Sequence, residues 1–161
     1  MGLKAILAKP FATYIKFKVN NWANNPVKTQ EKVFKELIKQ ASQTAFGKDH
    51  DFNSIHTFEE FKNRVPVRDY EGLKAYVDRA VNGEEDVLWK GKPIYFAKTS
   101  GTTSGAKYIP LTKESMPNHI EAARNAILLY IAETGNSSVV NGKMIFLQGS
   151  PILTEKNGIQ L

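Results

Sequence analysis

Residues 98–112 read KTSGTTSGAKYIPLT. Within this stretch, residues 99–105 hold two glycines and five hydroxyl side chains, and Lys107 follows two positions later. The flanking segments IYFAK (94–98) and YIPLT (108–112) are rich in β-branched and aromatic residues, which predicts a strand on each side. Glycine- and serine-rich segments also serve as flexible linkers. Between two apolar strands, however, the pattern favours a turn inside a fold.

The residue types of this turn are suited to binding phosphate. Glycines permit backbone conformations closed to other residues, so that consecutive amides can point at one anion. Short hydroxyl side chains add donors, and a lysine adds a mobile positive charge. Each hydrogen bond to a charged group contributes about 1.5–3 kcal/mol. The alternative is a purely structural turn. The candidate phosphate-binding residues are Thr99, Ser100, Gly101, Thr102, Thr103, Ser104, Gly105 and Lys107.

Other nucleotide-binding and catalytic patterns are absent from this stretch. A Walker A motif requires glycine before the lysine and a hydroxyl residue after it, but Ala106 and Tyr108 stand there. The dinucleotide pattern Gly-x-Gly-x-x-Gly is missing too. Serine nucleophile chemistry needs a nearby base, and no histidine lies in the flanking segments. We therefore interpret the hydroxyls as ligands and assign no catalytic residue.

The first half of the sequence is expected to be helical. Apolar residues recur at helical spacing among lysines over residues 3–19, with Pro10 expected to break or kink the helix. Asn25-Pro26 is typical of a helix start, and Gly47 is expected to end that helix. Thr57 and Glu60 have capping-box spacing. Asp69 is expected to cap a further helix that stops at Asn82-Gly83.

Strands are expected to dominate the second half. They are predicted at 87–89, at 94–98, at 108–112, where Pro110 favours an edge position, and at 143–150. Thr112 is a candidate cap for a long helix that ends at Gly135. Its expected buried stripe comprises Met116, Ile120, Ala123, Ile127, Leu128 and Ile131.

The last residues have a hairpin signature around Asn157-Gly158, and the chain stops three residues after this turn. We therefore expect residues 1–161 to be a piece of a longer protein. A cut sheet exposes its edges, so the fragment is also expected to self-associate.

Composition narrows the class of protein. Hydrophobic residues make up 42% of the chain and charged residues 24%, as in ordinary globular proteins. No cysteine is present, which agrees with a reducing, cytoplasmic location. The three histidines lack metal-ligand spacing, so no metal site is predicted. No signal peptide or bilayer-spanning run is evident, so stable membrane insertion is not expected.

The net charge of +6 is concentrated at the N-terminus. Residues 1–50 hold nine lysines and three acidic residues, whereas residues 51–161 hold 13 basic and 13 acidic residues. Nucleic-acid binding would need a basic patch with aromatic stacking platforms or a known motif, and neither is present. A basic amphipathic N-terminal helix can bind a membrane surface or an acidic partner. The favoured interpretation is a helix that packs on its own domain and exposes its lysines to solvent.

The loop resembles that of the adenylate-forming superfamily of acyl-CoA synthetases and luciferases, whose signature is of the type Thr-Ser-Gly-Thr-Thr-Gly-x-Pro-Lys. The sequence departs from it in having Ser104 before Gly105, and Ala106 in place of proline. The segments VPVRDYEGLKAYVDRAVNGEEDVLW and FAKTSGTTSGAKYIPLT resemble the auxin-responsive acyl acid-amido synthetase family in a bacterial-type version, from about Phe46 onward. The first 45 residues are similar only in general character.

The resemblance implies an α/β fold, with a helical N-terminal half followed by strands, as part of the large N-terminal domain of an adenylate-forming enzyme. Residues 1–161 would be an incomplete N-terminal domain that binds nucleotide and acyl group, and the remainder of that domain and a C-terminal domain would be absent. It implies a ligase that activates a small carboxylic acid with ATP and joins it to an amino acid. Thr99 to Ser104 and Lys107 would contact the ATP phosphates. Arg124, on the helix after the loop, is a candidate contact for the substrate carboxylate or a solvated surface residue.

The resemblance also implies Mg²⁺, with ligands beyond Leu161, so the fragment alone is predicted to be inactive. The alternative enzyme is an acyl-CoA ligase of the same superfamily, with a thiol acceptor. The alternative from another class of protein is a non-catalytic module whose basic N-terminal helix binds a membrane or a partner.

Overall fold

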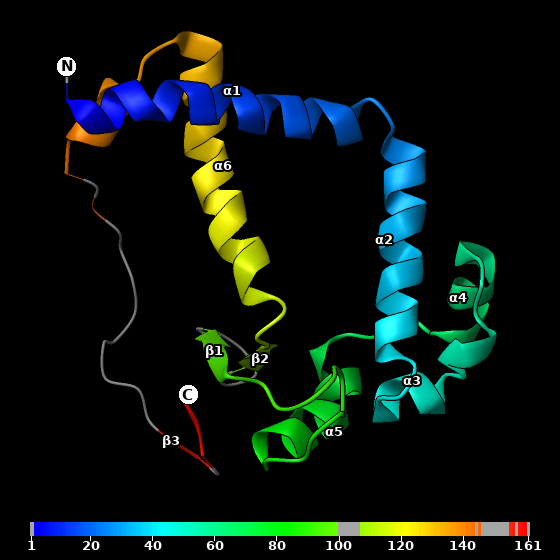
Figure 1. Cartoon of the computed structure of the whole chain (residues 1–161). Coiled ribbons are helices and arrows are strands. Elements are labelled where there is room, and N and C mark those ends of the chain that lie inside the picture. Colours follow the sequence, from blue (N-terminus) through cyan, green and yellow to red (C-terminus); the bar gives the residue numbers. More distant parts are fainter. Residues whose placement is uncertain (1, 100–106, 144, 146–154, 157, 161) are drawn as a thin grey trace. The chain divides into compact units, whose positions relative to one another are not determined.

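The structure is a computed structural model that describes residues 2–99, 107–143, 145, 155–156 and 158–160 (Figure 1). The chain divides into two compact units. Unit one comprises Met1–Thr29 and Met116–Pro151, and unit two comprises Gln30–Ser115 and Ile152–Leu161. The expected order of a helical first half followed by strands is confirmed.

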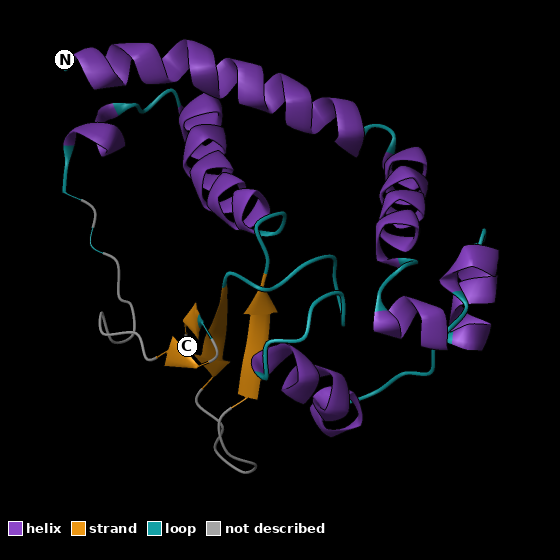
Figure 2. Cartoon of the chain, turned by 60° about the horizontal axis from the view of Figure 1, so that its bottom comes forward, coloured by secondary structure: helices purple, strands orange, loops and turns teal. Residues whose placement is uncertain are grey.

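Unit one is built on two long helices, α1 (Leu3–Ala23) and α6 (Met116–Thr134), with the short 3-10 helix η2 (Ser138–Asn141) (Figure 2). Helix α1 continues through Pro10, so the predicted break is wrong. Pro10 lies on the exposed side, where water can hydrogen-bond the carbonyl group that a proline leaves without an N–H partner.

The core of unit one lies where α1 and α6 pack together. Ala12 and Ile15 of α1 are buried against Leu128 and Ile131 of α6, and the small alanine side chain permits close approach of the backbones. The ammonium of Lys16 and the carboxylate of Glu133 form an ion pair at 3.0 Å beside this core.

The buried stripe predicted for α6 is only partly right. Leu128 and Ile131 are buried, whereas Ala123 and Ile120 are exposed, Ile120 to 60%. The helix begins at Met116, after a turn in which the amide of Ser115 donates to the Thr112 hydroxyl, so Thr112 precedes the helix instead of capping it directly. The predicted end is confirmed: Gly135 has φ of 70°.

Unit two begins with most of α2 (Pro26–Ala41), followed by α3 (Ala45–Asp49) and the 3-10 helix η1 (Phe52–Ser54). The start of α2 at Pro26 is as predicted, but its predicted end at Gly47 is wrong because Gly47 lies inside α3. A Cβ at Gly47 would stand 2.0 Å from the Ala41 carbonyl oxygen. The glycine is therefore needed for close packing of α3 on the end of α2.

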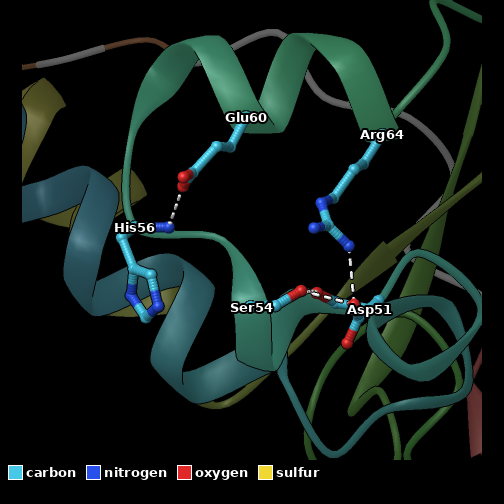
Figure 3. A network of polar contacts seen from close by, with 5 residues as sticks. All are labelled: Asp51, Ser54, His56, Glu60 and Arg64. Carbon is cyan, nitrogen blue, oxygen red and sulfur yellow. Dashed lines mark hydrogen bonds and ion pairs between the residues drawn. The ribbon is translucent and has the colours of Figure 1, made fainter.

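Helix α4 (Phe58–Arg64) has the predicted capping box. Figure 3 shows Glu60 of this box beside His56, and Arg64 beside Asp51. The Thr57 hydroxyl accepts the Glu60 amide at 3.2 Å, and the Glu60 carboxylate accepts the amides of Thr57 and His56. At the other end of the helix, Arg64 donates to the Asp51 carboxylate at 2.6 Å. These contacts join both ends of α4 to the segment before it.

Helix α5 (Tyr70–Val81) begins and ends as predicted. The Asp69 carboxylate accepts the Gly72 amide at 2.9 Å, and Gly83 follows the C-cap residue Asn82 with φ of 90°. Both ends are therefore determined by local sequence signals.

The four strands of unit two form one sheet in the order β2-β1-β4-β3. Strands β1 (Tyr95–Thr99) and β2 (Lys107–Leu111) are antiparallel, β1 and β4 (Ile159–Gln160) are parallel, and β4 pairs antiparallel with β3 (Glu155–Lys156). The hairpin around Asn157-Gly158 and the edge position of Pro110 in β2 are confirmed. Most of the strand predicted at 143–150 lies outside the described residues.

The strand predicted at 87–89 is wrong, since this segment is a loop. Asp86, with φ of 55°, starts the loop, and its carboxylate accepts the Gly91 amide at 2.7 Å. The carbonyls of Asp86 and Val87 accept amides from the start of α3, at 2.7 and 3.0 Å. Val87 nevertheless fills the core, which also contains Val77, Ala80, Val81, Phe96 and Ile159.

Candidate phosphate-binding hairpin

The β1–β2 hairpin brings the two ends of the hydroxyl-rich segment together. Thr99, the last residue of β1, pairs with Lys107, the first residue of β2. Directly opposed residues of an antiparallel pair point to the same face of the sheet, so their side chains are neighbours there. The remaining predicted ligands, Ser100, Gly101, Thr102, Thr103, Ser104 and Gly105, lie outside the described residues.

The side chain of Lys107 lies over an aromatic ring. Its ammonium is 5.5 Å from the ring centroid of Tyr70, and the residue is half-buried. A lysine over a ring face at this distance makes a cation–π contact. Tyr70 therefore limits the positions that the ammonium group can take beside the loop.

Tyr70 also binds the backbone of the hairpin. Its hydroxyl accepts the amide of Tyr108 at 3.0 Å. Because β2 is an edge strand, this amide would otherwise need a partner outside the sheet. The first turn of α5, capped by Asp69, is thus joined to the residue that follows Lys107. The sequence carries no local signal for this contact, because Tyr70 and Tyr108 meet only through tertiary packing.

Beneath the hairpin, the sheet packs on a hydrophobic core. Phe96 of β1 is buried, and its ring meets the Tyr108 ring edge to face, with centroids 6.4 Å apart. Phe96 and Tyr108 belong to one face of the hairpin, and Thr99 and Lys107 to the other. The core therefore holds one face, while Thr99 and Lys107 belong to the opposite face.

Arg124, the predicted contact for a substrate carboxylate, lies on α6 in unit one and is exposed. Its guanidinium is 3.2 Å from the Glu121 carboxylate and lies 5.7 Å from the ring centroid of Phe11. These are contacts of a surface arginine within its own unit. A substrate role for Arg124 stays a prediction.

His50 does not present a free ring nitrogen. His50 is buried, with Nδ1 2.7 Å from the Phe46 carbonyl oxygen and Nε2 2.9 Å from the Arg68 guanidinium. Both ring nitrogens therefore have protein partners. Within the described ranges, no group of three or more histidine, aspartate or glutamate side chains is arranged to hold a metal ion.

Comparison with known proteins gives the family. The GH3 family N-terminal domain matches residues 16–161, which is most of the chain. The chain belongs to the GH3 family. This GH3 chain is 33% identical over 105 residues to indole-3-acetic acid-amido synthetase GH3.4 of Arabidopsis thaliana, a match that covers 65% of the chain and 18% of the relative. It is 27% identical over 135 residues to jasmonoyl-L-amino acid synthetase JAR4 of Nicotiana attenuata, a match that covers 82% of the chain and 23% of the relative.

A solved structure has the same fold. The GH3 chain superposes on AtGH3.15 acyl acid amido synthetase in complex with 2,4-DB, with a TM-score of 0.80 and 24% identity. The superposition covers 92% of the chain and 26% of that protein. The expected fold class, helices followed by strands, is confirmed by this superposition, and the family match assigns the fold to the GH3 family N-terminal domain. The chain spans about a fifth of the length of the curated relatives, 18% and 23% of the two named above.

Proposed function

We propose that this chain is the N-terminal part of an ATP-dependent acyl acid-amido synthetase, which joins a small carboxylic acid to an amino acid. Membership of the GH3 family supports this proposal, as do the names of the relatives, which are amido synthetases acting on indole-3-acetic acid or forming jasmonoyl-amino acids. These names also favour an amine acceptor over the thiol of an acyl-CoA ligase.

The proposed reaction has two steps. The substrate carboxylate attacks the α-phosphorus of ATP, which forms an acyl adenylate and releases pyrophosphate. The amine of the amino acid then attacks the acyl carbon, which forms the amide and releases AMP. Since the substrate itself is the nucleophile in the first step, the protein needs to bind and orient ATP and to stabilise the charge that develops on pyrophosphate.

The proposal assigns the contacts with the ATP phosphates to Thr99 to Gly105 and Lys107. The observation that carries it is the pairing of Thr99 with Lys107, which closes the hydroxyl-rich segment into a hairpin connection with the lysine at its base. Tyr70 supports the same assignment, because it contacts the Lys107 ammonium and binds the next amide. A preorganised lysine loses less entropy when it binds an anion.

The proposal extends to the rest of the enzyme. A magnesium ion would offset phosphate charge, and we place its ligands, together with the remainder of the large domain and a C-terminal domain, after Leu161. The full-length enzyme would be cytoplasmic, in keeping with a sequence without cysteine. The 161-residue chain by itself is expected to bind polyphosphate without turnover and to self-associate through exposed sheet edges.

Calorimetry with pyrophosphate, and with an ATP analogue that cannot be hydrolysed, tests the phosphate site. Lys107→Ala should weaken binding about tenfold or more, because it removes a charge-assisted contact. Lys113→Ala is the matched control: it removes the same charge from an exposed position in the turn after β2 and should leave affinity almost unchanged. Equal effects of the two variants would contradict a specific site.

Turnover is tested separately. Incubation of the chain with ATP, magnesium, carboxylic acids and amino acids should give no sustained pyrophosphate release. Sustained release would contradict the assignment of the missing catalytic parts to the region after Leu161. In a full-length GH3 enzyme that carries these residues, consumption of an amino acid rather than coenzyme A distinguishes the amido synthetase from the acyl-CoA ligase.

A further inference from the structure

Helix α1 has two apolar faces, and α6 covers one of them. Residues of the covered face recur at three- and four-residue spacing: Ala8, Ala12, Ile15 and Val19 pack in the cluster shared with α6, and Ala5 is buried on the same side of the helix. A second set recurs at similar spacing, displaced by about 200° around the helix: Leu3, Ile6, Leu7, Tyr14 and Phe17. We call this second set the outer face. Figure 2 shows α6 and η2 on one side of α1.

The outer face is exposed although its side chains are large and apolar. Leu3 and Phe17 are each 71% exposed, and Leu7 is 61% exposed. Scattered apolar residues on a surface need no explanation, but a continuous stripe along one helix face marks an interaction site. Tyr14, in the middle of this face, is 54% exposed. Tyrosine and tryptophan are the residues enriched where protein meets the lipid headgroup region.

The charged residues of α1 itself are all lysines. Lys4, Lys9 and Lys18 are exposed on α1, and the ammonium of Lys18 lies 5.8 Å from the Tyr14 ring centroid. The first acidic residue of the chain is Glu31, after the helix has ended. The outer face is therefore an apolar stripe within a positive field, and the surface complementary to it is apolar with negative charge at its boundary.

We propose that the outer face of α1 docks on an anionic lipid surface and lies in its headgroup region. An interfacial helix places its apolar side chains below the headgroups while lysines reach anionic lipids at its flanks. A second copy of this chain fits less well, because pairing two outer faces would bring their lysines together. The proposed contact is with the membrane surface only, since no helix in the described part of the chain is long and apolar enough to cross a bilayer.

Vesicle co-sedimentation of the full chain tests the proposal. The chain should sediment with vesicles of phosphatidylcholine mixed with phosphatidylglycerol, remain in solution with phosphatidylcholine alone, and be released by high salt. Failure to sediment with the anionic vesicles, or equal sedimentation with both kinds, would overturn the proposal.

A pair of variants separates the stripe from simple charge attraction. Phe17→Glu should lower the partition coefficient about a hundredfold, because it removes an apolar anchor and adds a negative charge. Ala23→Glu adds the same charge to the same helix, at an exposed position about 120° around the helix from Phe17. It should lower the partition coefficient about fivefold. Circular dichroism checks that both remain folded. Equal losses would overturn a role for the outer face.

Fluorescence gives a readout that does not depend on sedimentation. The chain has two tryptophans, and Trp89→Phe leaves only Trp22. Trp22→Phe combined with Tyr14→Trp then moves the single tryptophan to the outer face. Its emission should shift to the blue with anionic vesicles, and an unchanged spectrum would overturn the proposal. Light scattering tests whether a second copy of the chain binds the outer face instead. If the chain binds no vesicles and forms a dimer that Phe17→Glu dissociates, the outer face is a dimer interface.

Discussion

At the scale of single residues, Tyr70 connects α5 with the candidate phosphate hairpin. Its hydroxyl accepts an edge-strand amide, and its ring supports the Lys107 ammonium. The caps Thr57 and Asp69 were predictable because each binds an amide three residues away. Tyr70 was not predictable, since its partner is 38 positions away and is reached only when the sheet has formed.

Replacing Tyr70 with phenylalanine separates its two contacts. Tyr70→Phe keeps the ring beside Lys107 but leaves the Tyr108 amide without its acceptor, so we expect the free energy of unfolding to fall by about 1 kcal/mol. Urea unfolding measures this. Tyr14→Phe, which removes a hydroxyl from a side chain exposed on α1, should change it by less than about 0.5 kcal/mol. Equal stabilities of the two variants would exclude a structural role for the Tyr70 hydroxyl.

At the scale of elements, α4 shows how a short helix is stabilised by its ends (Figure 3). The amides of His56 and Thr57 hold the pKa of Glu60 below its ordinary value of 4.5. A hydrogen bond from Ser54, assisted by one from Arg64, likewise lowers the pKa of Asp51. Both carboxylates must be ionised to accept these bonds fully, so the ends of α4 are sensitive to acid.

Acid should therefore weaken the N-terminal end of α4. Because the folded pKa of Glu60 is lowered, its contribution to stability is complete above about pH 4.5 and is lost as the pH falls through the folded value. Glu60→Gln should flatten the fall in stability below this pH, as measured by urea unfolding across a pH series. Glu59→Gln removes the same charge from the neighbouring position and should keep the steeper fall; identical profiles would contradict the assignment.

At the scale of the whole molecule, each of the two units has hydrophobic packing of its own. Ile131 is buried between α1 and α6 in unit one, and Val77 is buried between α5 and the sheet in unit two. Each unit is assembled from two segments, and these segments alternate along the sequence. Periodicity along the chain does not reveal such a division, because it identifies apolar faces but not their partners.

Truncation of each core should act on its own unit. Ile131→Ala is expected to destabilise by about 3 kcal/mol and to reduce the hydrogen-exchange protection of α1 and α6 while leaving α5 protected. Val77→Ala should reduce protection of α5 and β1 and leave α1 unchanged. Exchange measured by mass spectrometry distinguishes the two patterns. Uniform loss of protection in either variant would show that the two cores unfold as one.

Local signals along the sequence determined much of this protein. The ends of α5, the capping box of α4, the edge position of Pro110 and the final hairpin were predictable because each depends on residues a few positions apart. The same holds for the strands on either side of the hydroxyl-rich segment.

Tertiary structure decided the rest. Val87 is apolar and β-branched, yet it fills the core from a loop, because the start of α3 takes the carbonyl groups that a strand would have used. Gly47 is required by the nearby Ala41 carbonyl and not by a helix end. The sequence makes α1 apolar and basic. Only its packing on α6 decides which of the two apolar faces is buried and which is exposed, because periodicity alone does not say which face meets another helix.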